Sequence, residues 1–206
     1  MEKNGILIWQ AISLLKAFQH YLYAKEIQKI CEFDNIKFEV FVMEKPSVNV
    51  LEDKTKDGIH IIFNIKMHKA EQIYLRKQIL NKVEDVFDNL PLINNADQIF
   101  DEGVTRGCVN WQMFGSKKPN NEAYELTYYV NATYSENNNY WDFENNNVSN
   151  WKNDKNYLKL LPKLSARNNN HQEFDLKDDE DLKLLINKKY DNINNKNSNT
   201  NINISN

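Results

Sequence analysis

The sequence predicts an α+β fold, in which a mostly antiparallel sheet with flanking helices is followed by a disordered Asn-rich tail. Two long segments repeat apolar residues at three- to five-residue steps, which is the pattern of a helix with one buried face. Short runs rich in β-branched and aromatic residues have the composition of strands. Eight of the last fifteen residues are Asn, and such a segment buries too little apolar surface to offset its chain entropy.

The N-terminal part predicts a helix followed by a β-hairpin. Residues 4–30 carry one apolar stripe, so we expect a helix there. The run FEVFV at 38–42 predicts a strand, and an Asp-Gly turn signal precedes the returning strand IHIIF at 59–63. The two strands should therefore form a hairpin with a long loop over residues 45–56.

The middle of the chain predicts a second helix and three further strands. Residues 68–89 repeat apolar side chains at helical spacing. Residues 98–114 contain two apolar runs punctuated by Gly103 and Gly107, which favours a strand, a turn and a strand. Residues 124–134 (YELTYYVNATY) alternate well enough to predict one more strand.

A change in composition near residue 135 marks the expected domain boundary. Residues 1–135 should form the core, and residues 136–188 a C-terminal extension that packs partly on it. Within the extension, residues 155–166 keep apolar periodicity and residues 178–188 favour a short helix. Residues 189–206 should form the disordered tail.

Composition argues against several classes of function. A net charge of -3 provides no overall positive field, which disfavours a simple non-specific DNA-binding protein. Cys31 and Cys108 lack the paired spacing of zinc ligands, so we expect buried thiols. No GxxxxGK[ST] P-loop occurs. Without a signal peptide or a run of about 20 apolar residues, the protein is expected to be soluble and intracellular, with no membrane partner.

His60 is the first candidate for chemistry. Strand alternation puts it on the same face as Ile62 and opposite to Ile59 and Ile61. A strand holds an imidazole rigidly, and an imidazole can donate a hydrogen bond to a phosphate oxygen. A histidine on a strand is more often a half-buried structural residue, and the strand alone does not decide between these interpretations.

Carboxylates stand at three candidate positions. Asp101 follows two apolar residues at the end of an expected strand, where metal ligands are common, but Asp also favours the turn that DEG would form. Glu32 and Asp34 are two residues apart, the spacing that puts two carboxylates on one face of a strand, but the preceding helix favours a loop here. The acidic run at 178–181 fits a solvated helix N-terminus.

The segment GSKKP at 115–119 is a candidate phosphate-binding loop. Backbone N–H groups, the Ser116 hydroxyl and one of Lys117 and Lys118 could hold a triphosphate. The same residues suit an exposed hairpin tip with solvated lysines equally well.

The order of these signals resembles a known family. KDGIHIIF, a long helix, IFDEGV and NWQMFGSKKPNNEAYELT follow one another as in the primase domain of the primase–helicases of nucleocytoplasmic large DNA viruses, the poxvirus, asfarvirus and mimivirus type. FEVFVMEKPSVNV before the histidine is similar to the same family. So is PKLSARNNN after the core, with Ala166 in place of an isoleucine. The resemblance covers residues 10–170.

The resemblance implies an archaeo-eukaryotic-type primase core with an RRM-like part. Such an enzyme makes primers from NTPs or dNTPs on a single-stranded DNA template, with Mg²⁺ or Mn²⁺. His60 would contact the phosphates of the incoming nucleotide, Asp101 would bind metal, and Lys117 or Lys118 would bind nucleotide. Replication would take place in the host cytoplasm.

The family's first motif, a DxD strand, would lie upstream of the helix at 4–30, so we expect this chain to lack it, together with the helicase domain. Two-metal phosphoryl transfer needs several carboxylates around ions about 4 Å apart, and Asp101 alone would serve one ion. The expectation is little or no primer synthesis by this chain by itself, with a separate polypeptide supplying the missing strand or the helicase.

Three functions remain open at this stage. The chain could be a primase-type nucleotidyltransferase core, whole or degenerate, whose nucleotide binding depends on His60 and Lys118. It could instead be a non-catalytic module that binds single strands or a replication partner, with exposed Trp111 and Tyr128 stacking on bases. Absence of both nucleotide and DNA binding would indicate a relic without function.

Overall fold

The computed structural model describes residues 21–32, 37–47, 49–53, 55–56, 58–87, 93–107, 109, 111–146, 148, 157–166, 168 and 171–188. The chain divides into two compact units. A helical unit comprises residues 1–32, 67–110 and 175–206, and a sheet unit comprises residues 33–66 and 111–174. Each unit is therefore assembled from segments that are distant in the sequence.

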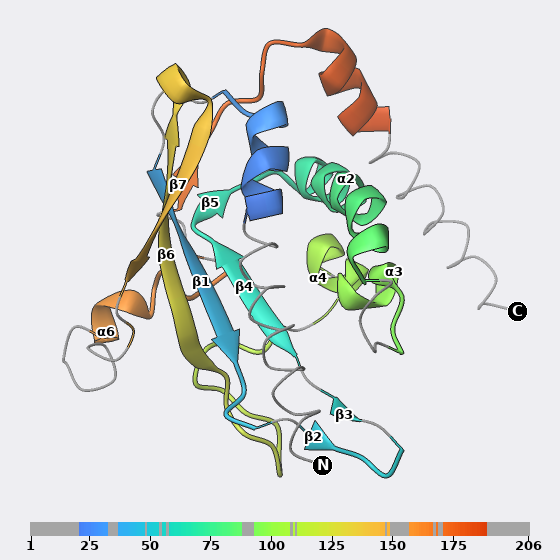
Figure 1. Ribbon diagram of the computed structural model, residues 1–206, viewed down its shortest axis with the longest axis vertical. Coiled ribbons are helices and arrows are strands. Elements are labelled where there is room, and N and C mark those ends of the chain that lie inside the picture. Colours follow the sequence, from blue (N-terminus) through green and yellow to red (C-terminus); the bar gives the residue numbers. More distant parts are fainter. Residues whose placement is uncertain are drawn as a thin grey trace, which may run out of the picture. The chain divides into compact units, whose positions relative to one another are not determined.

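The sheet unit is built on four antiparallel strands in the order β4-β1-β6-β7 (Figure 1). The central strand β1 (Lys37–Glu44) pairs with β4 (Ile59–Phe63) on one side and with β6 (Glu125–Ser135) on the other. Strand β6 pairs in turn with β7 (Tyr140–Asn146). The predicted hairpin and the strand predicted at 124–134 are confirmed, whereas β7 was not predicted.

Two short ladders complete the strands of this unit. Within the loop of the β1–β4 hairpin, β2 (Asn49–Val50) pairs antiparallel with β3 (Thr55–Lys56). After β4, β5 (Ile65–Lys66) pairs in parallel with β8 (Gln172–Glu173), and Lys66 forms an ion pair with Glu173. The second ladder joins two segments that are more than a hundred residues apart in the sequence.

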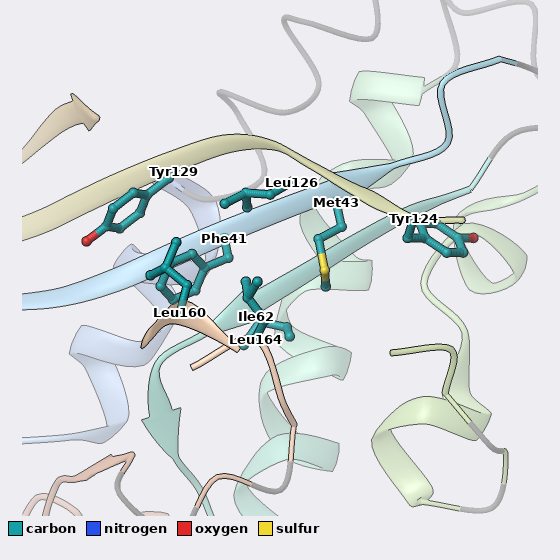
Figure 2. Packing of buried hydrophobic residues seen from close by; sticks show 8 residues of the cluster. All are labelled: Phe41, Met43, Ile62, Tyr124, Leu126, Tyr129, Leu160 and Leu164. Atoms are coloured by element: carbon teal, nitrogen blue, oxygen red, sulfur yellow. The ribbon is translucent and has the colours of Figure 1, made fainter. Parts of the chain in front are cut away.

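One face of the sheet carries an apolar cluster that includes the C-terminal part of the unit. Helix α6 (Tyr157–Leu160) and the turn after it bring Leu160 and Leu164 against Phe41 and Ile62 (Figure 2). The cluster consists of Phe41, Met43, Ile62, Tyr124, Leu126, Tyr129, Leu160 and Leu164, with Trp111, Phe114 and Val148 packed at its edge.

The opposite face is also buried. Trp141 on β7 is 1% exposed, and its ring lies 5.3 Å from that of Phe38 and 5.2 Å from that of Tyr134. Val40 and Val130 of the two central strands are fully buried. Because both faces of β1 are covered, the middle of the strand, VFVM at 40–43, is a continuous apolar run rather than an alternating pattern.

The helical unit contains helices at residues 21–30 and 180–188, together with α2 (Lys69–Phe87), α3 (Ala96–Ile99) and α4 (Glu102–Arg106). Its buried apolar residues include Ala24, Ile27, Ile30, Ile73, Ile79 and Val83. The helix predicted at 68–89 is confirmed, and the one predicted at 4–30 is confirmed over its described part. None of the helices in the described ranges combines the length and the apolar character needed to cross a membrane. With the antiparallel sheet, these helices confirm the predicted α+β fold.

The prediction of strand, turn and strand at 98–114 is wrong. Asn95 and Gln98 form a reciprocal capping box that begins α3, and the Asp101 side chain caps α4. Gly107 ends α4 in the left-handed conformation, with φ of 64°. The described residues from 109 to 114 form no strand. Capping chemistry at Asn95, Asp101 and Gly107 therefore outweighs the strand propensity of the apolar runs between them. The predicted tail at 189–206 lies outside the described residues.

Trp141 tests the packing of the sheet. Replacing Trp141 with Ala should lower the free energy of unfolding by about 3–5 kcal/mol, because the variant loses a large buried ring and leaves a cavity. Tyr140, its neighbour in β7, is 60% exposed, so Tyr140→Ala should cost about 0.5 kcal/mol or less. Chemical denaturation of both variants measures the difference, and equal losses would contradict this packing.

Candidate functional site

His60 lies in β4 and is the cross-strand partner of Met43 in β1. Its side chain is therefore on the face of the sheet that carries the apolar cluster. Its ring stacks on Tyr124, with centroids 3.8 Å apart and an angle of 13° between the planes. Trp111 contacts the same ring, with centroids 4.6 Å apart and a tilt of 36°. The imidazole is therefore held by two aromatic side chains and a strand.

These two aromatic residues begin and end the segment 111–124, which carries Ser116, Lys117 and Lys118. The segment closes on itself, because the Gly115 N–H donates to the Tyr124 carbonyl at 3.1 Å. Gly115 has φ of 73°, a left-handed conformation that glycine adopts without strain. The candidate loop is thus fastened at both of its ends to His60.

Within this loop the predicted residues have different environments. Lys117 and Lys118 are exposed. The Ser116 hydroxyl donates to the Met113 carbonyl at 2.6 Å, so its proton is used inside the turn. Sequence reasoning missed Lys45, whose ammonium lies 5.6 Å from the centre of the Tyr124 ring and donates to Asn121 Oδ1 at 3.3 Å. Lys45 follows a strand end that FEVFVMEKP marks, but nothing in its own spacing singles it out.

Burial keeps the His60 ring neutral. Desolvation lowers the pKa of His60 to about 4, a hydrogen bond with the Gln112 backbone acts in the opposite direction, and Lys45 lowers the pKa further. Among the described residues, the buried Nδ1 of His60 has no hydrogen-bond partner. A buried polar atom without a partner is costly, which favours a ligand at this position.

Gly58 is required by the position of Tyr124. A Cβ atom added at Gly58 would lie 2.6 Å from the Tyr124 hydroxyl, closer than real contacts allow. The glycine of KDGIHIIF therefore permits the close approach that lets Tyr124 reach His60. The sequence marked this glycine only as part of a turn.

Asp101 belongs to the helical unit and is exposed. Its Oδ1 accepts a hydrogen bond from the Gly103 N–H at 2.8 Å, which makes it the N-cap of α4. One carboxylate oxygen is thus engaged in capping. Whether Asp101 also binds a metal stays a prediction.

Arg76 holds the backbone next to Asp101, a role that sequence reasoning missed. It is 8% exposed and donates from Nε to the Phe100 carbonyl at 2.7 Å. Its Nη2 donates to the Asp97 carbonyl at 3.0 Å and to Asp97 Oδ1 at 2.9 Å. The only signal in the sequence was a cation among the residues of α2 that face the core.

The described residues do not present a ligand set for a two-metal site. No group of three or more His, Cys, Asp and Glu side chains lies close enough together in the described part of the chain to hold an ion. Of the acidic pair considered above, Glu32 follows the helix at 21–30, as predicted, and Asp34 lies outside the described residues. Cys31 is buried, as predicted, and Cys108 is also outside them.

The expectation that Trp111 and Tyr128 are exposed is wrong, since both are half-buried. Trp111 packs against His60 and the edge of the apolar cluster. A base could not stack on the face of Trp111 that contacts the histidine unless the loop moved.

Comparison with known proteins identifies the family. The family described as "C962R protein N-terminal AEP domain", of the archaeo-eukaryotic primase type, matches residues 14–130, which is more than half of the chain. The chain belongs to this primase family. The matched range of this primase-type domain includes β1, His60, Asp101 and the whole loop at 111–124, and the resemblance to viral primase–helicases is confirmed.

A curated relative of this chain is named as a helicase. The primase-type domain is 30% identical over 112 residues to the "Putative helicase L207/L206" of Acanthamoeba polyphaga mimivirus. The aligned part is 53% of this chain and 11% of that protein, so the chain spans a small fraction of the relative's length.

Gly58→Ala tests the architecture of the site. The new methyl group should displace Tyr124, lower the free energy of unfolding by about 1–3 kcal/mol and let water reach the His60 ring. The pKa of His60 should then rise from about 4 toward its ordinary value, which NMR titration of the ring protons measures.

Gly107→Ala is the control for this substitution. It strains a left-handed residue, which costs about 1–2 kcal/mol, but the added methyl group meets nothing within 4 Å. Its His60 pKa should equal that of the wild type. A His60 pKa that does not move in Gly58→Ala would contradict the assigned role of Tyr124.

Proposed function

We propose that this primase-type domain binds a nucleoside triphosphate at His60, as the nucleotide site of a primase-type nucleotidyltransferase. The His60 ring would meet the phosphates, and Lys45, Lys117 and Lys118 would supply positive charge around them. Family membership supports the reaction class, and the fastening of the 111–124 loop to His60 supports the position of the site.

One observation carries the proposal most directly. His60 Nδ1 is buried and, among the described residues, has no hydrogen-bond partner, although lysines of its own unit stand near the same ring and loop. A phosphate oxygen at Nδ1 would remove the cost of the unpaired atom. The site would then combine a rigid imidazole with cations that can follow the ligand, a common arrangement for phosphate recognition.

Phosphate binding at this position should be coupled to protonation. A neutral imidazole has one N–H, so donation to a phosphate while the Gln112 hydrogen bond is kept requires the imidazolium. A bound phosphate would favour that charged form and raise the pKa of His60 above about 4. Nucleotide affinity should therefore increase as pH falls through the pKa of the complex.

Further parts of the proposal rest on the family alone. Primer synthesis would use single-stranded DNA as template and Mg²⁺ or Mn²⁺ as cofactor, in the host cytoplasm, together with a helicase domain or a separate helicase. Asp101 is the candidate metal ligand, but the described residues do not surround it with others. Transfer of a nucleotidyl group would require carboxylates beyond those residues.

Equilibrium binding of a fluorescent nucleoside triphosphate to the purified chain tests the nucleotide site. His60→Phe keeps a ring for Trp111 and Tyr124 to contact but removes the nitrogens, so affinity should fall roughly 10- to 100-fold. Lys118→Ala should cost roughly two- to fivefold, the value of an exposed ion pair.

Two exposed residues provide controls. His68→Ala and Lys159→Ala should bind the nucleotide as the wild type does, because neither belongs to the loop or its aromatic contacts. The proposal is wrong if His60→Phe binds nucleotide as tightly as the wild type. Metal-independent binding of an oligonucleotide that survives in His60→Phe, without any nucleotide binding, would favour the single-strand-binding alternative instead.

A further inference from the structure

A second polar site lies in the sheet unit, around Glu39 of β1. Lys163 donates to both carboxylate oxygens of Glu39 at 2.8 Å, and Tyr129 and Asn64 donate to one oxygen each. Burial alone would raise the pKa of Glu39, but the hydrogen bonds from Lys163, Tyr129 and Asn64 hold it below its usual value. Glu39 is therefore ionised and paired with Lys163.

Two acceptor atoms beside this pair are buried and have no hydrogen-bond partner among the described residues. The first is Asn64 Oδ1, which belongs to the amide whose nitrogen donates to Glu39 Oε2 at 2.8 Å. The second is Nε2 of His171, a side chain that is 9% exposed. Its ring hydrogen-bonds to the Lys163 backbone, so the lone pair of Nε2 is left over.

Asn64 and His171 each stand immediately before a strand of the β5–β8 ladder. Ile65 pairs in parallel with Gln172, so Asn64 and His171 are the residues that directly precede the first pair of this ladder. The ion pair between Lys66 and Glu173 fastens the same ladder. Asn64 and the Lys163 ammonium both donate to Glu39, and the His171 ring hydrogen-bonds to the backbone of the same Lys163, so the carboxylate, the amide and the imidazole belong to one network.

This set of donors is suited to a cation. All three groups offer lone pairs, and an imidazole that gives its other N–H to a backbone carbonyl has the arrangement usual for histidine metal ligands. A site of one imidazole with two oxygens suits Mn²⁺, Co²⁺ or Zn²⁺ better than Mg²⁺, which prefers oxygen and keeps its waters.

Lys163 already supplies a positive charge here, and its exposure determines how a metal could enter. Its side chain is 40% exposed, whereas that of Glu39 is 16% exposed. The ammonium can therefore swing into solvent and release Glu39. We propose that Glu39, Asn64 and His171 form a binding site for a divalent transition-metal ion, in which the ion replaces the Lys163 ammonium. This site shares no residue with the proposed nucleotide site.

Mn²⁺ titration of the metal-free full chain, without nucleotide, tests the proposal by the loss of the free-ion EPR signal. His171→Ala should weaken the affinity of this site about tenfold or more, the loss of one of three ligands. Lys163→Met should tighten it roughly two- to tenfold, because the competing ammonium is gone. A gain of affinity cannot result from misfolding, so Lys163→Met keeps the test decisive if His171→Ala is unstable.

Co²⁺ provides a spectroscopic signature of the same site. Its complex should show a hyperfine-shifted imidazole N–H proton in the NMR spectrum, and that signal should be missing in His171→Ala. His68→Ala, which removes an exposed histidine, should leave both metals unaffected. The proposal would be overturned by an Mn²⁺ affinity that is the same in His171→Ala as in the wild type. An unchanged affinity in Lys163→Met, or the absence of saturable binding to the wild type, would also overturn it.

Discussion

The simultaneous pairing of β1 with β4 and with β6 is the constraint on which the sheet unit depends. It joins a local hairpin, which ends at Phe63, to a strand that begins only at Glu125, so one buried strand fixes the register of its two neighbours. The register also decides which side chains share a face. Phe41 and Met43 face the same side as His60 and Ile62, and Glu39 continues that row toward Asn64.

Both proposed sites follow from this single face of the sheet. At one end of the row, His60 is enclosed by Tyr124 and Trp111 and keeps an unpaired nitrogen. At the other end, Lys163 and Asn64 donate hydrogen bonds to the half-buried carboxylate of Glu39. The apolar cluster between them, with Leu160 and Leu164 packed against it, excludes water and strengthens the electrostatic interactions at both ends.

Sequence patterns predicted the elements whose apolar residues repeat regularly. Composition and apolar spacing correctly predicted three strands and one helix, at 38–42, 59–63, 124–134 and 68–89. The prediction for residues 98–114 was wrong because side-chain caps at Asn95 and Asp101 decide the conformation of this segment. Strand β7 was not predicted because its sequence is rich in Asn, and pairing with β6 stabilises it as a strand. His60 and the 111–124 loop could be found from their order in the chain. Lys45, Lys163 and His171 could not, since only tertiary contacts give them partners.

In the proposed nucleotide site, the unpaired Nδ1 of His60 receives a phosphate oxygen of the nucleotide. Long-range proton–nitrogen NMR of the histidine rings, recorded during titration with a nucleoside triphosphate, tests it most directly. We expect the chemical shift of His60 Nδ1 to move from the value of an unprotonated nitrogen toward that of a protonated one, with a rise in the pKa of His60 from about 4. Saturation with nucleotide while both His60 nitrogens keep their shifts would contradict it.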